Sequence, residues 1–193
     1  MLFRSVRDKY GIDREYFLYL GTVEPRKNLE RLIAAYDQFR QGKTAPPYLV
    51  LAGGKGWLDS GIYKKVEELG LSDLVKFTEY VPDEEICPLM CGALAFVFPS
   101  IYEGFGLPPL EAMACGVPVL TTHAASLPEV VGEDAVVADP YSPESIAAGL
   151  EQLYTDEALR QKLREAGPKR AAQFTWERSA EQLYAVYQEA CRE

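Results

Sequence analysis

Residues 93–116 read A-L-A-F-V-F-P-S-I-Y-E-G-F-G-L-P-P-L-E-A-M-A-C-G and combine an apolar run, a turn with two glycines and a helical stretch. Residues 93–98 are all apolar, which predicts a buried strand. The pattern of residues 109–115 predicts a helix that ends at Gly116, because glycine commonly follows a helix C-terminus. A buried strand followed directly by a helix is typical of parallel α/β sheets.

The same alternation of strand and helix continues on both sides of this unit. Further strands are predicted at residues 16–22, 48–52, 74–77, 117–121 and 135–138. Further helices are predicted at residues 28–40, 62–69, 83–90, 143–154, 157–173 and 176–191. The sequence thus predicts a single α/β domain with a doubly wound, Rossmann-like, mostly parallel sheet flanked by helices. Residues 16–174 would form its core and residues 175–193 a helical tail.

The composition of the 193 residues, 48% hydrophobic and 25% charged, is typical of a soluble globular domain. A formal net charge of -9 argues against a general affinity for nucleic acid or an anionic membrane. No apolar run approaches the roughly 20 residues that span a bilayer, and the charged first ten residues do not resemble a signal peptide. We therefore expect a cytoplasmic protein whose anionic ligands bind in a local pocket.

The four cysteines, Cys87, Cys91, Cys115 and Cys191, are too few for a disulfide framework in a chain of this length. Cys87 and Cys91 are one helical turn apart, but only His123 could join them as a nitrogen ligand. The pattern favours buried free thiols in a reducing compartment over a zinc site. No metal site is predicted.

Ligands of doubly wound sheets bind beyond the carboxyl ends of the strands. Four loops occupy such positions, at residues 21–28, 53–57, 80–82 and 100–109. In the last of these, two glycines permit close approach of the backbone to a ligand. The N–H groups of Phe105, Gly106 and Leu107 could face an anion at the helix start. The alternative is a tight turn without a ligand, with Glu111 in the first turn stabilising its own helix by up to about 1 kcal/mol.

Residues 21–28 read G-T-V-E-P-R-K-N, so that Arg26 and Lys27 immediately precede a predicted helix. Cations are unfavourable near the positive end of a helix dipole, which indicates that an anion lies nearby. The alternative is a solvated pair of surface charges.

Two phosphate-binding motifs are not matched. Residues 53–56, G-G-K-G, lack the Ser or Thr and the upstream glycine of a P-loop. Residues 104–106, G-F-G, lack the third glycine of a dinucleotide-binding fingerprint. A single histidine, His123, leaves little scope for a Ser-His-Asp or Cys-His device. Neither an NTPase nor an oxidoreductase is supported.

Together these loops resemble glycosyltransferase family 4, whose members are retaining enzymes with the GT-B fold. The most specific match is residues 103–111, E-G-F-G-L-P-P-L-E, which is similar to the family signature of two glutamates separated by seven residues. The resemblance runs from residue 16 over nearly the whole chain and includes residues 21–28, 49–54, 75–82 and 116–129. Residues 24–28, E-P-R-K-N, are similar to the corresponding loop of bacterial mannosyltransferases of surface polysaccharide synthesis.

The resemblance implies a site for the donor diphosphate. Lys27 would contact the phosphates, with Gly21 packing close to them and the N–H groups of residues 105–107 facing sugar and phosphate. Many family members carry Arg directly after the first-loop glycine, where this chain has Thr22. Arg26 would supply that charge from another direction.

The resemblance also assigns the rest of the donor. Glu111 would accept hydrogen bonds from the ribose hydroxyls, and Glu103 from the hydroxyls of the donor sugar, as a positioning group rather than a nucleophile. The backbone at Tyr80 and Val81 would hold the base, and Gly53 would line the nucleotide cleft.

The implied reaction is metal-independent, same-face transfer of a hexose from GDP-mannose or a UDP-hexose to a glycan acceptor, with retention of configuration. An N-terminal domain absent from this chain would supply the acceptor site and the catalytic base, and residues 176–191 would return towards it. This domain alone would bind donor without transferring sugar, and the full-length enzyme would lie at the inner face of the membrane. Alternatives are a non-catalytic nucleotide-sugar-binding subunit and another GT-B enzyme such as a sugar epimerase, against which the two-glutamate signature argues.

Overall fold

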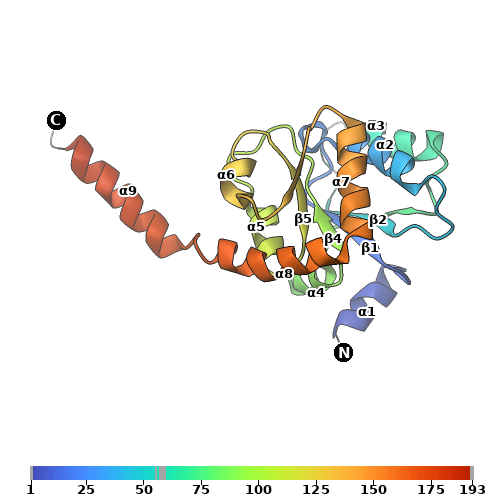
Figure 1. Cartoon of the computed structure of the whole chain (residues 1–193), viewed down its shortest axis with the longest axis horizontal. Coiled ribbons are helices and arrows are strands. Elements are labelled where there is room, and N and C mark those ends of the chain that lie inside the picture. Colours follow the sequence, from blue (N-terminus) through green and yellow to red (C-terminus); the bar gives the residue numbers. More distant parts are fainter. Residues whose placement is uncertain (1, 55, 57–59, 192–193) are drawn as a thin grey trace.

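A six-stranded parallel sheet forms the centre of the domain in the computed structural model, which describes residues 2–54, 56 and 60–191 (Figure 1). The strands are β1 (Tyr16–Leu20), β2 (Tyr48–Ala52), β3 (Val75–Glu79), β4 (Ala95–Val97), β5 (Val119–Thr122) and β6 (Val136–Ala138). They are arranged in the order β3-β2-β1-β4-β5-β6, and every neighbouring pair is parallel. This is the strand order of a doubly wound sheet, so the predicted fold class is confirmed.

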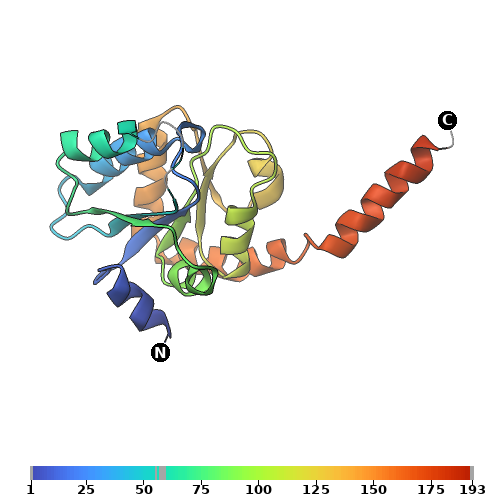
Figure 2. The same ribbon diagram turned by 180° about the vertical axis from the view of Figure 1, so that it is seen from behind.

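Helices cover both faces of the sheet (Figures 1 and 2). The helices in the described residues are α1 (Leu2–Lys9), α2 (Leu29–Arg40), α3 (Ser60–Glu68), α4 (Asp83–Cys91), α5 (Leu107–Ala114), α6 (Leu127–Val131), α7 (Pro143–Thr155), α8 (Glu157–Ala171) and α9 (Trp176–Ala190). Helix α2 packs against α3 and α7, α5 packs against α8, and α1 packs against α4. Because parallel crossovers are right-handed, the reversal of strand order at β1 places the helices that follow β1 and β4 on opposite faces.

The core is built around the neighbouring inner strands β1 and β2. Tyr16, Phe17, Leu18 and Tyr19 of β1 are fully buried, and all of β2 is buried. Such continuous apolar strands are expected where helices cover both faces of a parallel sheet. The predicted apolar face of α2 is confirmed by its buried residues, which include Leu29, Leu32, Ile33, Tyr36 and Phe39.

Three elements are not predicted by the sequence patterns. They are α1, α6 and a 3₁₀ helix at Pro25–Lys27. Helix α1 has four charged residues among eight, and α6 is only five residues long, so neither shows a full helical period. Helix α5 also begins at Leu107, two residues earlier than predicted, because prolines are tolerated in a first helical turn.

The predicted burial of the free cysteines is wrong for Cys87, Cys91 and Cys191, which are exposed, while Cys115 is half-buried. On α4 the buried side chains are those of Leu89 and Met90, and the two cysteines of this helix lie outside that face.

Helix α9 projects from the rest of the domain and buries none of its side chains (Figures 1 and 2). It nevertheless carries large apolar groups, namely Trp176, Leu183, Tyr184, Val186 and Tyr187. Among the described helices, none is both long enough and apolar enough to cross a bilayer.

Candidate donor-binding site

The loops after β1 and β4 meet where the strand order reverses. The N–H of Ile101 donates to the carbonyl of Arg26 at 3.1 Å, and the Arg26 side chain donates to the carbonyl of Tyr102 at 3.0 Å. The two loops proposed from sequence to bind phosphate therefore form one continuous surface. It lies at the topological switch point, which is the usual ligand crevice of an open α/β sheet.

Lys27 is buried in this surface and paired with Glu103. Only 10% of either side chain is exposed, and Lys27 Nζ lies 2.7 Å from Glu103 Oε1. The same Nζ lies 4.8 Å from the ring centroid of Phe98, a cation–π contact. The alternative of a solvated surface charge is therefore wrong for Lys27. The anion that offsets its position before α2 is supplied by the protein itself.

Arg26 completes the network from the solvent side. Its guanidinium donates to Glu103 Oε2 at 3.0 Å and to Glu24 Oε1 at 2.7 Å, while 45% of the side chain is exposed. Arg26 and Lys27 thus bind different oxygens of one carboxylate, which fixes the orientation of Glu103 before any ligand arrives.

Glu103 is held in its ionised form. Burial raises the pKa of its carboxyl, but the hydrogen bond and charge of Lys27, together with the charge of Arg26, lower that pKa below its ordinary value. A carboxylate offers about four lone-pair positions, and the two cations occupy two of them. Two positions remain for hydroxyl donors such as those of a sugar.

The first turn of α5 leaves backbone donors free. Gly106 precedes the helix with φ of 108°, no side chain caps the N-terminus, and the first turn holds no acidic residue. In the described part of the chain, the N–H groups of Phe105, Gly106 and Leu107 have no hydrogen-bond partner. These N–H groups and the positive end of the helix dipole favour an anion beside Lys27 and Arg26.

Glu111 lies in the second turn of α5, because the helix begins at Leu107. The alternative of a first-turn glutamate that stabilises its own helix is therefore wrong. Its side chain is exposed, and it forms no ion pair with any residue that the structure describes. The contact with ribose remains a prediction.

Gly21 and Gly53 allow two strand ends to touch. A Cβ on Gly53 would lie 2.1 Å from the carbonyl oxygen of Gly21, and a Cβ on Gly21 would lie 2.8 Å from Tyr19 Oη. Their N–H groups already donate, to Ala52 and Glu79 respectively. Both glycines therefore shape the crevice through close packing rather than by offering donors. Residues 55 and 57 of the predicted 53–57 loop lie outside the described residues.

Tyr80 and Val81 follow β3, on the same carboxyl edge of the sheet. The Tyr80 side chain is 72% exposed, whereas Val81 is buried in the core. The contact of their backbone with the base remains a prediction.

Asn28 is a site-shaping residue that the sequence patterns miss. It adopts the left-handed conformation with φ of 62°, and its buried amide donates to the carbonyls of Pro99 at 3.0 Å and Pro140 at 2.7 Å. Asparagine before a helix would be interpreted as an N-cap, but this side chain caps no N–H. The local signal was only that asparagine tolerates this conformation. The two carbonyls it joins are set by the tertiary fold.

Ser126, in the loop after β5, is a second such residue. Its Oγ lies 3.1 Å from the carbonyl of Glu103 and 2.8 Å from that of Phe105. Ser126 therefore fixes the turn at residues 103–106 through two of its carbonyl groups. No local sequence signal indicates this contact.

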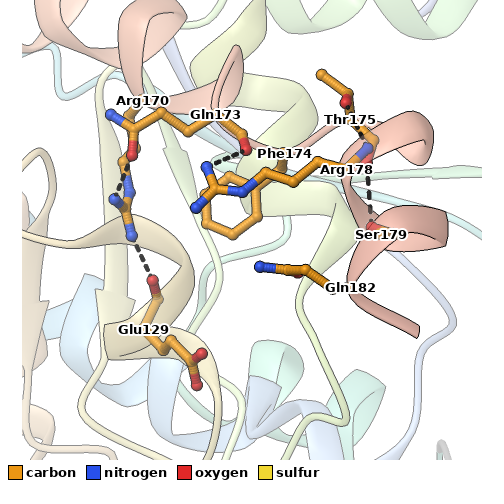
Figure 3. A pocket seen from close by; sticks show the side chains of 8 residues that line it. All are labelled: Glu129, Arg170, Gln173, Phe174, Thr175, Arg178, Ser179 and Gln182. Carbon is orange, nitrogen blue, oxygen red and sulfur yellow. Dashed lines mark hydrogen bonds between the residues drawn. The ribbon is translucent and has the colours of Figure 1, made fainter. Parts of the chain in front are cut away.

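A separate hollow of about 250 Å³ lies between α6 and the junction of α8 with α9 (Figure 3). It is lined by Glu129, Arg170, Gln173, Phe174, Thr175, Arg178, Ser179 and Gln182. None of the predicted donor-site residues lines it. It adjoins the site through Phe174, whose ring packs edge-on against that of Phe105 at 5.7 Å between centroids.

The fold defines a doubly wound α/β domain, and its switch point brings Lys27, Arg26 and Glu103 beside the free N–H groups of residues 105–107. Residues 3–170 match the family Glycosyl transferases group 1, and the chain belongs to this family. It is 43% identical over 172 residues to the O-antigen chain mannosyltransferase B of Escherichia coli, covering 89% of this chain and 45% of that protein.

Two solved structures share the fold. The C-terminal domain of a glycosyl transferase group 1 family protein (LpcC) from Francisella tularensis aligns with a TM-score of 0.75 at 26% identity, over 88% of this chain and 90% of that domain. HepE from Anabaena, in complex with UDP and glucose, aligns with a TM-score of 0.81 at 22% identity, over 98% of this chain and 52% of that one. The chain thus spans about half the length of mannosyltransferase B and of HepE.

Proposed function

We propose that this domain binds the nucleoside-diphosphate sugar of a retaining hexosyltransferase, with GDP-mannose as the favoured donor and a UDP-hexose as the alternative. The observation that carries the proposal is the juxtaposition of Lys27, Arg26 and Glu103 with the free N–H groups of residues 105–107. One surface thereby offers cations and backbone donors to a diphosphate and a carboxylate to sugar hydroxyls.

During transfer, negative charge grows on the departing nucleoside diphosphate. Preorganised cations and N–H groups stabilise such charge most effectively when they need not move. Lys27 meets this condition, since Glu103 and the ring of Phe98 already fix its ammonium group. Only one of the three ammonium N–H groups is engaged by Glu103, so the others can reach a phosphate oxygen. No metal ion is needed for this step.

Glu103 positions the hexose, and Glu111 binds the ribose. Glu103 is held by its two cations at the centre of the network, whereas Glu111 is exposed one helical turn beyond the free N–H groups. The mannosyltransferase relative supports mannose as the sugar, and the UDP and glucose of the HepE structure support a nucleotide and sugar in this fold.

The acceptor site and the catalytic base belong, in this proposal, to a further domain of the longer enzyme. The exposed apolar side chains of α9 support this, because they are available to pack against such a domain. The alternative of a non-catalytic subunit differs only in turnover.

Calorimetric titration with GDP, GDP-mannose, UDP and UDP-glucose tests the proposal. We expect one nucleotide pair to bind at a single site, and the other to bind at least tenfold more weakly. Failure of all four ligands to bind would contradict it. Turnover by the longer protein, with the anomeric configuration of the product read by NMR, separates a retaining enzyme from a silent subunit.

A further inference from the structure

Three cysteine thiols converge on one side of the domain. Cys87 and Cys91 are one turn apart on α4, and Cys115 is the residue that caps the C-terminus of α5. Their sulfur atoms all lie within 4.8 Å of one another, and those of Cys87 and Cys91 are 3.8 Å apart. Cys115 is 24 positions from Cys91 in sequence, so tertiary packing brings the third thiol to the pair.

This three-cysteine cluster is separate from the donor site. Cys91 and Cys115 precede β4 and β5, whereas Glu103 and the free N–H groups follow β4. The two sites thus lie at opposite ends of the same parallel strands, with α4 on the side of the domain that also carries α1 (Figure 1).

The spacing of the sulfur atoms matches a metal coordination sphere. Zinc binds thiolate at about 2.3 Å, which places the sulfur atoms of a tetrahedral site about 3.8 Å apart. The distance between the sulfur atoms of Cys87 and Cys91 is already 3.8 Å, and the others need to move by less than about 1 Å. Three thiolates select soft ions such as Zn²⁺, Cd²⁺ or Cu⁺ over Mg²⁺ and Ca²⁺.

The cluster is accessible from solvent. Cys87 and Cys91 are exposed, so an ion can enter from solvent. An ion that binds here displaces thiol protons, as is usual for thiolate sites.

We propose that Cys87, Cys91 and Cys115 form a three-thiolate site for a soft cation of the Zn²⁺ type. The fourth position is open to water or an external thiol, since the cluster contains no further His, Cys, Asp or Glu within the described residues. The ion joins the C-terminus of α4 to that of α5 and takes no part in sugar transfer.

The test is a titration of the reduced, metal-stripped chain with Zn²⁺ against a chromophoric chelator, and with Cd²⁺ monitored by thiolate charge-transfer absorption. One ion should bind per chain. With the ion bound, three fewer thiols per chain should react with a thiol reagent. Cys87→Ser, Cys91→Ser and Cys115→Ser should each weaken binding more than tenfold. Cys191→Ser is the matched control, because Cys191 is exposed and outside the cluster, and it should bind like the wild type.

Cys115→Ser is the decisive variant. If it binds Zn²⁺ as tightly as the wild type, the third ligand is wrong and the proposal is overturned. Absence of saturable binding in the wild type overturns it as well. Circular dichroism confirms that each variant is folded. A rise in Tm with Zn²⁺ in the wild type and Cys191→Ser, but not in Cys115→Ser, is a second required result.

Discussion

The two ends of the central strands show opposite ways of preparing a binding site. At the carboxyl end, Lys27 and Arg26 are charged and already paired with Glu103. At the amino end, the thiols of the three-cysteine cluster contact one another and form no ion pair with any residue that the structure describes. An internal carboxylate therefore holds the first site in a ligand-ready geometry, whereas the second needs its cation to hold three thiolates together.

The two sites therefore depend on different interactions. The proposed donor site depends on loops that tertiary hydrogen bonds tie together. The three-cysteine cluster depends on two helix ends and gains its cohesion from a bound ion. Changes at one end of the strands should leave binding at the other end intact.

The largest change in stability is expected from a substitution at the carboxyl end of the strands. Asn28→Ala removes two hydrogen bonds to buried carbonyls and puts a Cβ-bearing residue of low left-handed preference at φ of 62°. Leaving carbonyls unpaired costs about 1–3 kcal/mol, and the left-handed conformation about 1–2 kcal/mol. We expect the free energy of unfolding to fall by roughly 2–4 kcal/mol in chemical denaturation.

Asn28→Gly is the matched control, since glycine adopts this conformation freely and loses only the hydrogen bonds. It should be less destabilised than Asn28→Ala. Equal stability of Asn28→Ala and the wild type would show that Asn28 does not hold the loops.

Lys27→Ala should have the next largest effect. Charge-assisted hydrogen bonds contribute about 1.5–3 kcal/mol, so the Kd for nucleoside diphosphate should rise by roughly 10- to 150-fold. Because Glu103 loses one of its two cationic partners, some stability should be lost too.

Lys43→Ala provides the control for this measurement, because it removes a positive charge that pairs with Glu151 away from the crevice. Its Kd should equal that of the wild type. An unchanged Kd in Lys27→Ala by calorimetry would remove Lys27 from the site.

The sequence predicts those features of the two sites whose signals lie within one short segment, and it misses those that join distant segments. Lys27 and the turn at residues 103–107 carry their signals within short segments, through charge beside a helix start and glycine before one. The contacts of Asn28, Ser126 and Cys115 join segments far apart in the chain. Local periodicity contains no information about such pairs, although it was sufficient for the strands and most helices.

Glu111→Gln sharpens the assignment of ribose. It keeps the side-chain shape and removes the charge, so nucleoside diphosphate and nucleotide sugar should both weaken by similar amounts, roughly 1–3 kcal/mol. Thermal unfolding should be unchanged, because Glu111 lies beyond the first turn of α5 and has no ion pair among the described residues. A lower Tm with unaltered affinities would contradict the ribose contact.

Metal removal should change donor affinity least of all, whereas it should empty the three-cysteine cluster completely. Excess chelator should leave donor affinity within experimental error while stripping the thiolate-bound ion. A loss of donor affinity beyond about tenfold, or about 1.4 kcal/mol, would show that a metal neutralises the phosphates.

Glu103→Gln tests the central claim, that one network divides the donor between its phosphates and its sugar. The measurement is the ratio of Kd for nucleotide sugar to Kd for the bare nucleoside diphosphate, by calorimetry on wild type and variant. Replacing the carboxylate by an amide removes one acceptor oxygen and the negative charge, which weakens hydrogen bonds from sugar hydroxyls and frees the charges of Lys27 and Arg26. We predict that the nucleotide sugar weakens by roughly 1–3 kcal/mol relative to the diphosphate, which binds as tightly as before or more tightly. Equal weakening of both ligands would contradict the account.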